Sequence, residues 1–271
     1  MLGKLIKHEF KGSGRTMVPF ILVCLGLSVL AGLSIRGMEI QKDYGWFSIV
    51  FGIVMFLFVA GLIAVCVMAL VVCIERFRKN LLGDEGYLMF TLPVSVDEHI
   101  FAKLIVSSVW FIATWLVCML AFALMFLCNL NLIEVNWSEI SFVFGEIWAR
   151  LVDFGLLHVL GYFLEVLALV FVTCCGTCLQ LYCAMAIGYS FSNHKVLLSV
   201  VFYFVISMVL SFIQSFGMLF LNTLNIQPVQ SISNAGVVHV VLLAFLVYML
   251  VYATIMYIPT RLLLKHRLNL P

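Results

Sequence analysis

The sequence predicts an all-α polytopic membrane protein with six transmembrane helices. Of its 271 residues, 65% are hydrophobic and only 10% are charged, whereas soluble domains are about 45–50% apolar and about 25% charged. A soluble core of this size cannot bury that excess, because a folded domain still exposes much of its surface. The composition therefore excludes a soluble enzyme, and a net charge of only +2 argues against nucleic-acid binding.

Six apolar runs are long enough to cross about 30 Å of hydrocarbon. They predict spans over residues 17–35, 46–74, 104–128, 154–188, 196–219 and 237–258. Their short connections make residues 1–271 a single transmembrane domain. The fourth run is longer than a membrane requires. We therefore expect either a helix that projects outward or a separate interfacial piece at its start.

Lys and Arg residues beside the spans set the orientation, because cytoplasmic loops of membrane proteins are enriched in them. With the N-terminus inside, 12 of these residues flank the inner ends of the spans: Lys4, Lys7, Lys11, Arg15, Arg76, Arg78, Lys79, Lys103, Lys195, Arg261, Lys265 and Arg267. Only Arg36, Lys42 and Arg150 lie outside. Both termini are therefore predicted to be cytoplasmic.

Residues 1–16 are predicted to form an amphipathic helix on the inner membrane surface. Apolar side chains such as Leu5 and Phe10 share one helical face, while basic side chains such as Lys4 and Lys11 lie opposite. This pattern is typical of helices that lie in the membrane interface. The alternative is a plain basic flank of the first span.

The sequence contains no motif of a known catalytic or nucleotide-binding site. G-x-x-x-x-G-K-[ST], H-E-x-x-H and G-x-S-x-G are all missing, so we predict no catalytic residue and no cofactor bound by this chain. The nine cysteines lie almost entirely in apolar runs, as small packing residues do. Cys174-Cys175-x-x-Cys178 has no nearby His to complete a tetrahedral ligand set, so no metal site is predicted.

The connection between spans two and three, residues 75–98, is the longest inner loop. It reads ERFRKNLLGDEGYLMFTLPVSVDE, with an apolar patch of Tyr87, Leu88, Met89 and Phe90 after a charged turn. Exposed apolar residues flanked by charge are typical of a partner interface. They fit equally well a helix that folds back on the membrane surface. Ser95 is placed to cap the helix that becomes span three.

This loop resembles that of the membrane subunit of ATP-binding-cassette (ABC) exporters of the type-2 class. In that family a Gly and apolar residues precede L-P-x-S before span three. The pattern falls here on Gly86, Leu88, Leu92, Pro93 and Ser95. The amphipathic start MLGKLIKHEFKGSGRT, the six spans and the closing TRLLLKHRLNL extend the resemblance over essentially the whole chain.

The resemblance implies that residues 75–98 form a coupling helix seated in a groove of a separate cytosolic ATPase. The implied coupling residues are Arg76, Asp84, Glu85, Gly86, Tyr87, Leu88, Met89, Phe90, Leu92, Pro93 and Ser95. Two ATPase copies, which bind ATP and magnesium, and a second permease chain, identical or related, would complete a transporter of the bacterial plasma membrane. Its cargo would be an amphipathic peptide, an antimicrobial compound or a lipid-like molecule.

Ionisable residues inside spans are candidates for a transport pathway. Glu165 has His158 seven residues before it and Tyr162 between them, so that all three lie near one helical face. They are either exit-side groups of a pathway or an interface carboxylate with its neighbours. This leaves an ion-coupled transporter or channel without an ATPase as the alternative function, and an intramembrane enzyme as a less favoured one.

Overall fold

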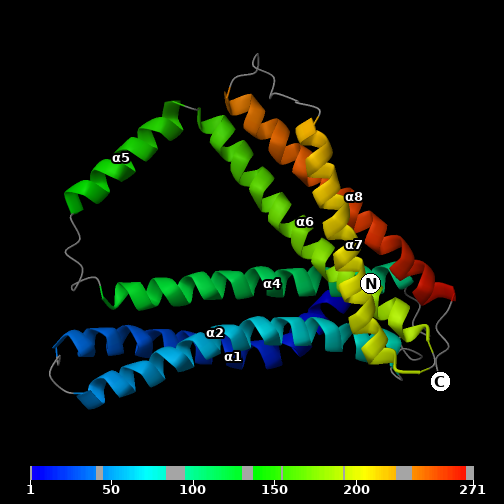
Figure 1. Cartoon of the computed structure of the whole chain (residues 1–271), viewed down its shortest axis with the longest axis horizontal. Coiled ribbons are helices and arrows are strands. Elements are labelled where there is room, and N and C mark those ends of the chain that lie inside the picture. The colour runs from blue at the N-terminus through cyan, green and yellow to red at the C-terminus, as the bar shows by residue number, and fades with distance from the viewer. Residues whose placement is uncertain are drawn as a thin grey trace. The chain divides into compact units, whose positions relative to one another are not determined.

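The computed structural model describes residues 2–40, 45–83, 95–129, 137–153, 155–191, 193–223 and 234–266. All regular structure in these ranges is helical (Figure 1). In chain order the elements are α1 (Leu2–Ile40), α2 (Gly45–Phe77), the π-helix η1 (Arg78–Leu82), α4 (Val96–Leu127), α5 (Trp137–Asp153), α6 (Leu156–Tyr189), α7 (Lys195–Thr223) and α8 (Asn234–His266).

Six of the described helices are long and apolar enough to cross a membrane. These candidate spans are Leu2–Met38, Gly45–Leu82, Val96–Leu127, Leu157–Tyr189, Lys195–Phe216 and Val238–Lys265. The predicted all-α fold with six spans is therefore confirmed, and the chain is a multi-pass membrane protein. The cytoplasmic placement of both termini stays a prediction.

All six span helices are longer than the roughly 20 residues that a bilayer needs, and two of them test the predictions made from the sequence. α1 continues without a break through 39 residues, or about 58 Å, so the amphipathic start and the first span belong to one helix. Whether its first turns lie on the inner membrane surface stays a prediction. α6 is likewise one helix of 34 residues, or about 51 Å. From Leu156 onward the fourth run is therefore one continuous helix, and its projection outward from the membrane stays a prediction.

The connection between α4 and α6 contains an amphipathic helix, α5. Phe144 and Trp148, one turn apart, are exposed apolar residues, and Glu146 is placed on the opposite helical face. A helix with one apolar and one acidic face between two membrane spans is typical of the membrane–water interface.

The chain divides into two compact units. The N-terminal unit consists of Gly3–Cys73 and Val109–Arg150, and the C-terminal unit consists mainly of Ile74–Ser108 and Leu151–Pro271. The helices of the N-terminal unit pack through a buried cluster of Cys24, Ala31, Phe58, Val65 and Ala121.

In the C-terminal unit, α6 packs against both α7 and α8 (Figure 1). α6 and α8 run parallel, because Gly161 faces His239 and, further along both helices, Gly176 faces Tyr252. A Cβ at Gly176 would lie 2.9 Å from the Tyr252 ring. The missing side chain therefore lets the two helices approach each other closely.

Candidate functional site

The predicted coupling loop falls largely outside the described residues, but both of its ends lie within them. The coupling residues outside are Asp84, Glu85, Gly86, Tyr87, Leu88, Met89, Phe90, Leu92 and Pro93. Their contact with an ATPase stays a prediction. The two described members are Arg76, half-buried in the last turn of α2, and Ser95, directly before α4.

The first part of the predicted coupling loop, residues 75–82, is fixed to α6. α2 passes into η1, where Phe77, Leu81 and Leu82 are buried. The Phe77 ring stacks on Tyr182 of α6, with centroids 4.0 Å apart and planes 7° apart. The Tyr182 hydroxyl lies 2.9 Å from Ser107 Oγ of α4. Short π-helical segments are often found at functional sites, and this one lies within the first part of the predicted coupling loop, residues 75–98.

The segment after the loop begins with a helix cap. Ser95 Oγ accepts the backbone N–H of Glu98, and the Glu98 carboxylate accepts the backbone N–H of Ser95, both at 3.3 Å. This reciprocal pair is a capping box, which satisfies two backbone donors at a helix N-terminus. The helix cap predicted at Ser95 is therefore confirmed.

Asp97, two residues further on, connects the start of α4 to the end of α8. Its Oδ1 lies 2.7 Å from Arg261 Nε and its Oδ2 lies 2.9 Å from Arg261 Nη2, a bidentate arrangement. Tyr257 donates its hydroxyl to the same carboxylate, and its ring stacks on Phe101 at 5.5 Å. In the sequence Arg261 is recognisable only as a basic residue beside the last span, so its contact with Asp97 was not predicted.

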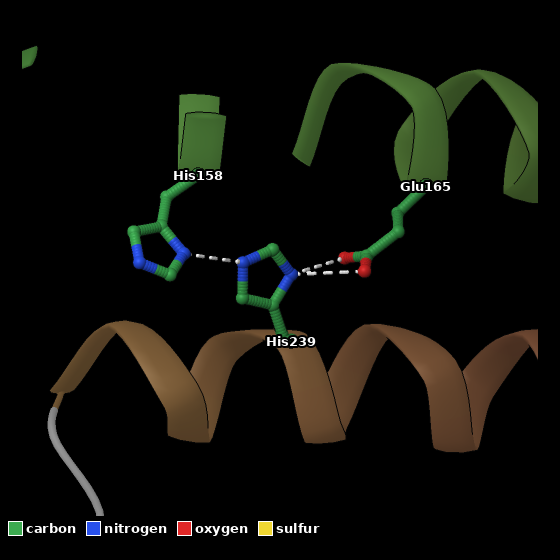
Figure 2. A network of polar contacts seen from close by, with 3 residues as sticks. All are labelled: His158, Glu165 and His239. Atoms are coloured by element: carbon green, nitrogen blue, oxygen red, sulfur yellow. Dashed lines mark hydrogen bonds and ion pairs between the residues drawn. The ribbon is translucent and has the colours of Figure 1, made fainter. Parts of the chain in front are cut away.

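The three candidate pathway residues lie near the beginning of α6, and all of them contact His239 of α8. Figure 2 shows His239 between His158 and Glu165. His239 Nδ1 lies 2.8 Å from Glu165 Oε1 and 3.0 Å from Oε2. His239 Nε2 lies 3.2 Å from His158 Nδ1. The Tyr162 ring stacks on His239, with centroids 4.1 Å apart. All three residues thus contact one side chain. We call these four residues the outer cluster, because the predicted orientation of the spans places the beginning of α6 on the outer side.

His239 fits between these side chains because α6 has a glycine there. A Cβ at Gly161 would lie 3.1 Å from His239 Cε1, tighter than most side-chain contacts. Sequence analysis did not identify His239, because its contact with Glu165 arises from the packing of two helices that are distant in sequence.

Glu165, His239 and His158 form a chain of hydrogen bonds, and the donors follow from one assumption, that Glu165 is ionised and both histidines are neutral. An ionised Glu165 carboxylate only accepts, so His239 donates from Nδ1. In a neutral imidazole Nε2 then accepts, and His158 Nδ1 donates to it. The side chains of His239 and Glu165 are 19% and 18% exposed. Such a chain is able to hold a proton and to pass it between water and a partly buried carboxylate.

The structure also places the cysteine cluster. Cys175 and Cys178 are buried, and their sulfurs lie 3.2 and 4.0 Å from Ser108 Oγ of α4. They pack between α6 and α4, as small apolar residues do. In the part of the chain that the structure describes, no group of three His, Cys, Asp or Glu side chains is placed to hold a metal ion.

Comparison with protein-family models, with curated proteins and with solved structures finds no match to this chain. Its function is therefore argued from its own residues.

Proposed function

We propose that the chain is the transmembrane permease subunit of a type-2 ABC exporter in the bacterial plasma membrane. Two copies of a separate cytosolic ATPase supply the hydrolysis of ATP with magnesium. A second permease chain, identical or related, completes the pathway. The cargo is an amphipathic peptide, an antimicrobial compound or a lipid-like molecule. In this proposal the chain itself performs no chemistry.

The attachment of the predicted coupling loop at both ends is the observation that carries the proposal. One end is held by the stack of Phe77 on Tyr182, and the other by the ion pair of Asp97 with Arg261. A loop that transmits the motion of an ATPase needs firm attachment at both ends, because slack at either end would absorb the movement. A free surface loop has no need of either contact.

The two attachments lead to different helices of the C-terminal unit. A displacement of Phe77 acts on α6 through Tyr182, and a displacement of Asp97 acts on α8 through Arg261. The same two helices meet again at Glu165 and His239. A small shift of α6 against α8 would therefore make or break that contact. An interface with two discrete arrangements is what an alternating pathway requires.

A second candidate function is an ion-coupled transporter without an ATPase, and the outer cluster is the observation that favours it. Chains of Asp, Glu and His side chains inside membrane spans are typical of proton relays. Glu165, His239 and His158 form such a chain in the described residues. The two functions differ in their energy source, which makes them separable by experiment.

The test is co-purification followed by an ATPase assay. The tagged chain is co-expressed with an ABC ATPase encoded beside its gene, and ATP hydrolysis is measured in lipid nanodiscs. Tyr87→Ala with Leu88→Ala removes predicted contact residues, and we expect the ATPase to be lost. Arg261→Ala breaks the attachment to α8. We expect it to retain the ATPase but to lose most of the permease-dependent change in hydrolysis rate.

Lys265→Ala is the matched control for Arg261→Ala. Lys265 lies one turn later on α8 and is exposed, so its removal changes the charge equally. If Arg261→Ala and Lys265→Ala behave alike, the proposed transmission of movement from Asp97 through Arg261 to α8 is wrong. If no ATPase binds and the chain alone carries protons in liposomes, the ion-coupled transporter replaces the ABC exporter.

A further inference from the structure

The C-terminal unit contains a polar cavity in the middle of its spans. The cavity has a volume of about 240 Å³ and lies between α6, α7 and α8. Its lining includes Thr173, Ser207 and Tyr252. Each of these lies at or within about two residues of the middle of its candidate span (Leu157–Tyr189, Lys195–Phe216 and Val238–Lys265). Uncharged polar side chains at such depth join helices by hydrogen bonds, and they also line substrate pathways where a cavity lies beside them.

Hydrogen bonds arrange the polar side chains at two levels of this cavity. Tyr252 donates its hydroxyl to Gln180 Oε1 at 2.7 Å, and Gln180 Nε2 donates to Ser207 Oγ at 2.6 Å. Gln180 is buried, so this group forms the base of the cavity. Gln214 Nε2 donates to the Tyr248 hydroxyl at 2.8 Å, and both residues are exposed at the mouth.

The cavity retains hydrogen-bonding capacity beyond these contacts. A glutamine amide has two N–H donors and a carbonyl oxygen with two lone pairs. Within the described residues, the Gln214 carbonyl and the Tyr248 hydroxyl proton have no further partner. A hydrogen bond that only joins two helices does not require a cavity around it, nor a second polar pair at its opening. The carbonyl oxygen of Gln214 and the hydroxyl proton of Tyr248 are therefore available to a molecule that enters the cavity.

The lining determines the chemical class of that ligand. Among the described residues it contains hydroxyl and amide side chains together with apolar Leu210 and Met249, and no Asp, Glu, Lys, Arg or His. An ionised group would enter this cavity without a counter-charge, at a large desolvation cost. The volume equals that of about eight water molecules in the liquid. It accommodates a small head group and not a whole peptide.

We infer that this cavity binds the head of an uncharged amphiphile that carries a hydroxyl or an amide group. The apolar part of the molecule remains among lipid chains outside the mouth. This inference deepens the proposed function by naming a cargo class. The binding of the amphiphile does not depend on the proposed function, but its role as cargo does. Along both α6 and α8 the cavity lies between the outer cluster and the attachments of the coupling loop. A shift of α6 against α8 would therefore change its width.

The test uses photolabelling in membranes of cells that express the full chain, without an ATPase. One probe is a photoactivatable monoacylglycerol, and the other is a photoactivatable fatty acid with the same chain, which is anionic. Labelled peptides are identified by mass spectrometry. We expect the neutral probe to label α6, α7 and α8 around the cavity, to saturate, and to be displaced by unlabelled monoacylglycerol but not by fatty acid.

Variants at the mouth make the test specific. Gln214→Leu and Tyr248→Phe each remove one hydrogen-bonding group from an exposed side chain, so neither disturbs a buried core. We expect each to reduce labelling about fivefold, the usual effect of one hydrogen bond. Thr254→Val is the matched control. It removes a hydroxyl from the exposed surface of α8 that bonds only to the Leu250 carbonyl of its own helix. It should leave labelling unchanged.

Equal labelling by both probes, or labelling that none of the variants alters, overturns the inference and leaves a cavity that lipid chains fill. Because labelling needs no ATPase, its failure together with intact ATPase binding removes the cargo site and not the proposed function. Specific labelling in a chain that binds no ATPase retains the site and removes the ABC exporter.

Discussion

The helices inside one unit of the chain are held together by other kinds of contact than the helices inside the other unit. In the N-terminal unit the helices meet mainly through small and apolar residues, and at Gly32 of α1 a Cβ would lie only 2.7 Å from Cβ of Cys128. Two hydrogen bonds add to this packing, from Trp110 Nε1 to Ser13 Oγ and from Asn129 Nδ2 to the Gly32 carbonyl. The C-terminal unit also has close approaches, as at Gly176, but among the described residues it has more hydrogen bonds and ion pairs between helices. These join Asp97 to Arg261 and Tyr257, Ser107 to Tyr182, Gln180 to Ser207 and Tyr252, and Glu165 to His239.

This difference separates a stable region from one that is suited to rearrangement. In a bilayer, apolar side chains gain little by leaving lipid for another helix, so close packing of small residues holds spans together. That packing is lost when the surfaces move apart. A hydrogen bond between spans contributes only about 0.6 kcal/mol on average and can be exchanged for another. If the chain is a permease as proposed, we expect the moving parts of its cycle to lie in the C-terminal unit.

The largest effect on stability is expected from Gly32→Ala in the N-terminal unit. The new Cβ would lie 2.7 Å from Cys128 Cβ and 3.0 Å from the Met125 carbonyl oxygen, and the backbone of α4 cannot move aside without loss of packing. We expect the free energy of unfolding to fall by about 1–3 kcal/mol, measured by denaturation in mixed detergent micelles.

Gly26→Ala on the same helix is the matched control, because a Cβ there has no neighbour within 4 Å. It should leave the free energy of unfolding unchanged or raise it by a few tenths of a kcal/mol through helix propensity. Equal effects of the two substitutions would show that close packing at Gly32 does not hold this unit together.

A smaller effect is expected from Ser95→Ala, at the end of the coupling loop. The substitution removes the hydroxyl that accepts the Glu98 N–H, and loss of such a cap costs about 1 kcal/mol. Because the change is local, we expect faster hydrogen exchange in the first turn of α4 and little change in global unfolding. Ser48→Ala, whose hydroxyl donates to the Gly45 carbonyl of its own helix, should have no such effect on exchange at either site. Unchanged exchange in Ser95→Ala would mean that the capping box does not hold the start of α4.

The spans could be predicted from sequence because a bilayer imposes both length and composition on them. The ends of the helices could not, because a helix continues into water with polar turns that hydropathy does not recognise. The third span was predicted from residue 104, whereas α4 begins at Val96 and includes Asp97 in its first turn. The helical face of His158, Tyr162 and Glu165 was predictable, since spacing along one helix determines it.

The partners of these residues were beyond sequence reasoning. His239 reaches Glu165 because Gly161 leaves room for its ring, and Asp97 meets Arg261 because α4 begins where α8 ends. Both contacts depend on which helices are neighbours, and hydropathy carries no information about that. In the sequence, His239 could have been noticed only as a single polar residue in an apolar run. It identifies a candidate but not its partner.

The smallest effect on stability, and a large one on function, is expected from the pair Glu165 and His239. In a double-mutant cycle with Glu165→Gln and His239→Gln, we expect a coupling energy of about 0.6 kcal/mol, the average for polar contacts between spans. Both side chains remain able to hydrogen-bond in these variants, so the helices should still associate.

Transport is the second measurement on the same pair. If the contact between α6 and α8 alternates during the cycle, each single variant should change the transport rate several-fold while the free energy of unfolding hardly moves. Thr254→Val on α8, which alters a hydroxyl that bonds within its own helix, should change neither quantity. A variant pair that lowers stability strongly and leaves transport unaltered would place the outer cluster with Gly32 among the static contacts. The division of the chain into a fixed unit and a moving unit would then have to be abandoned.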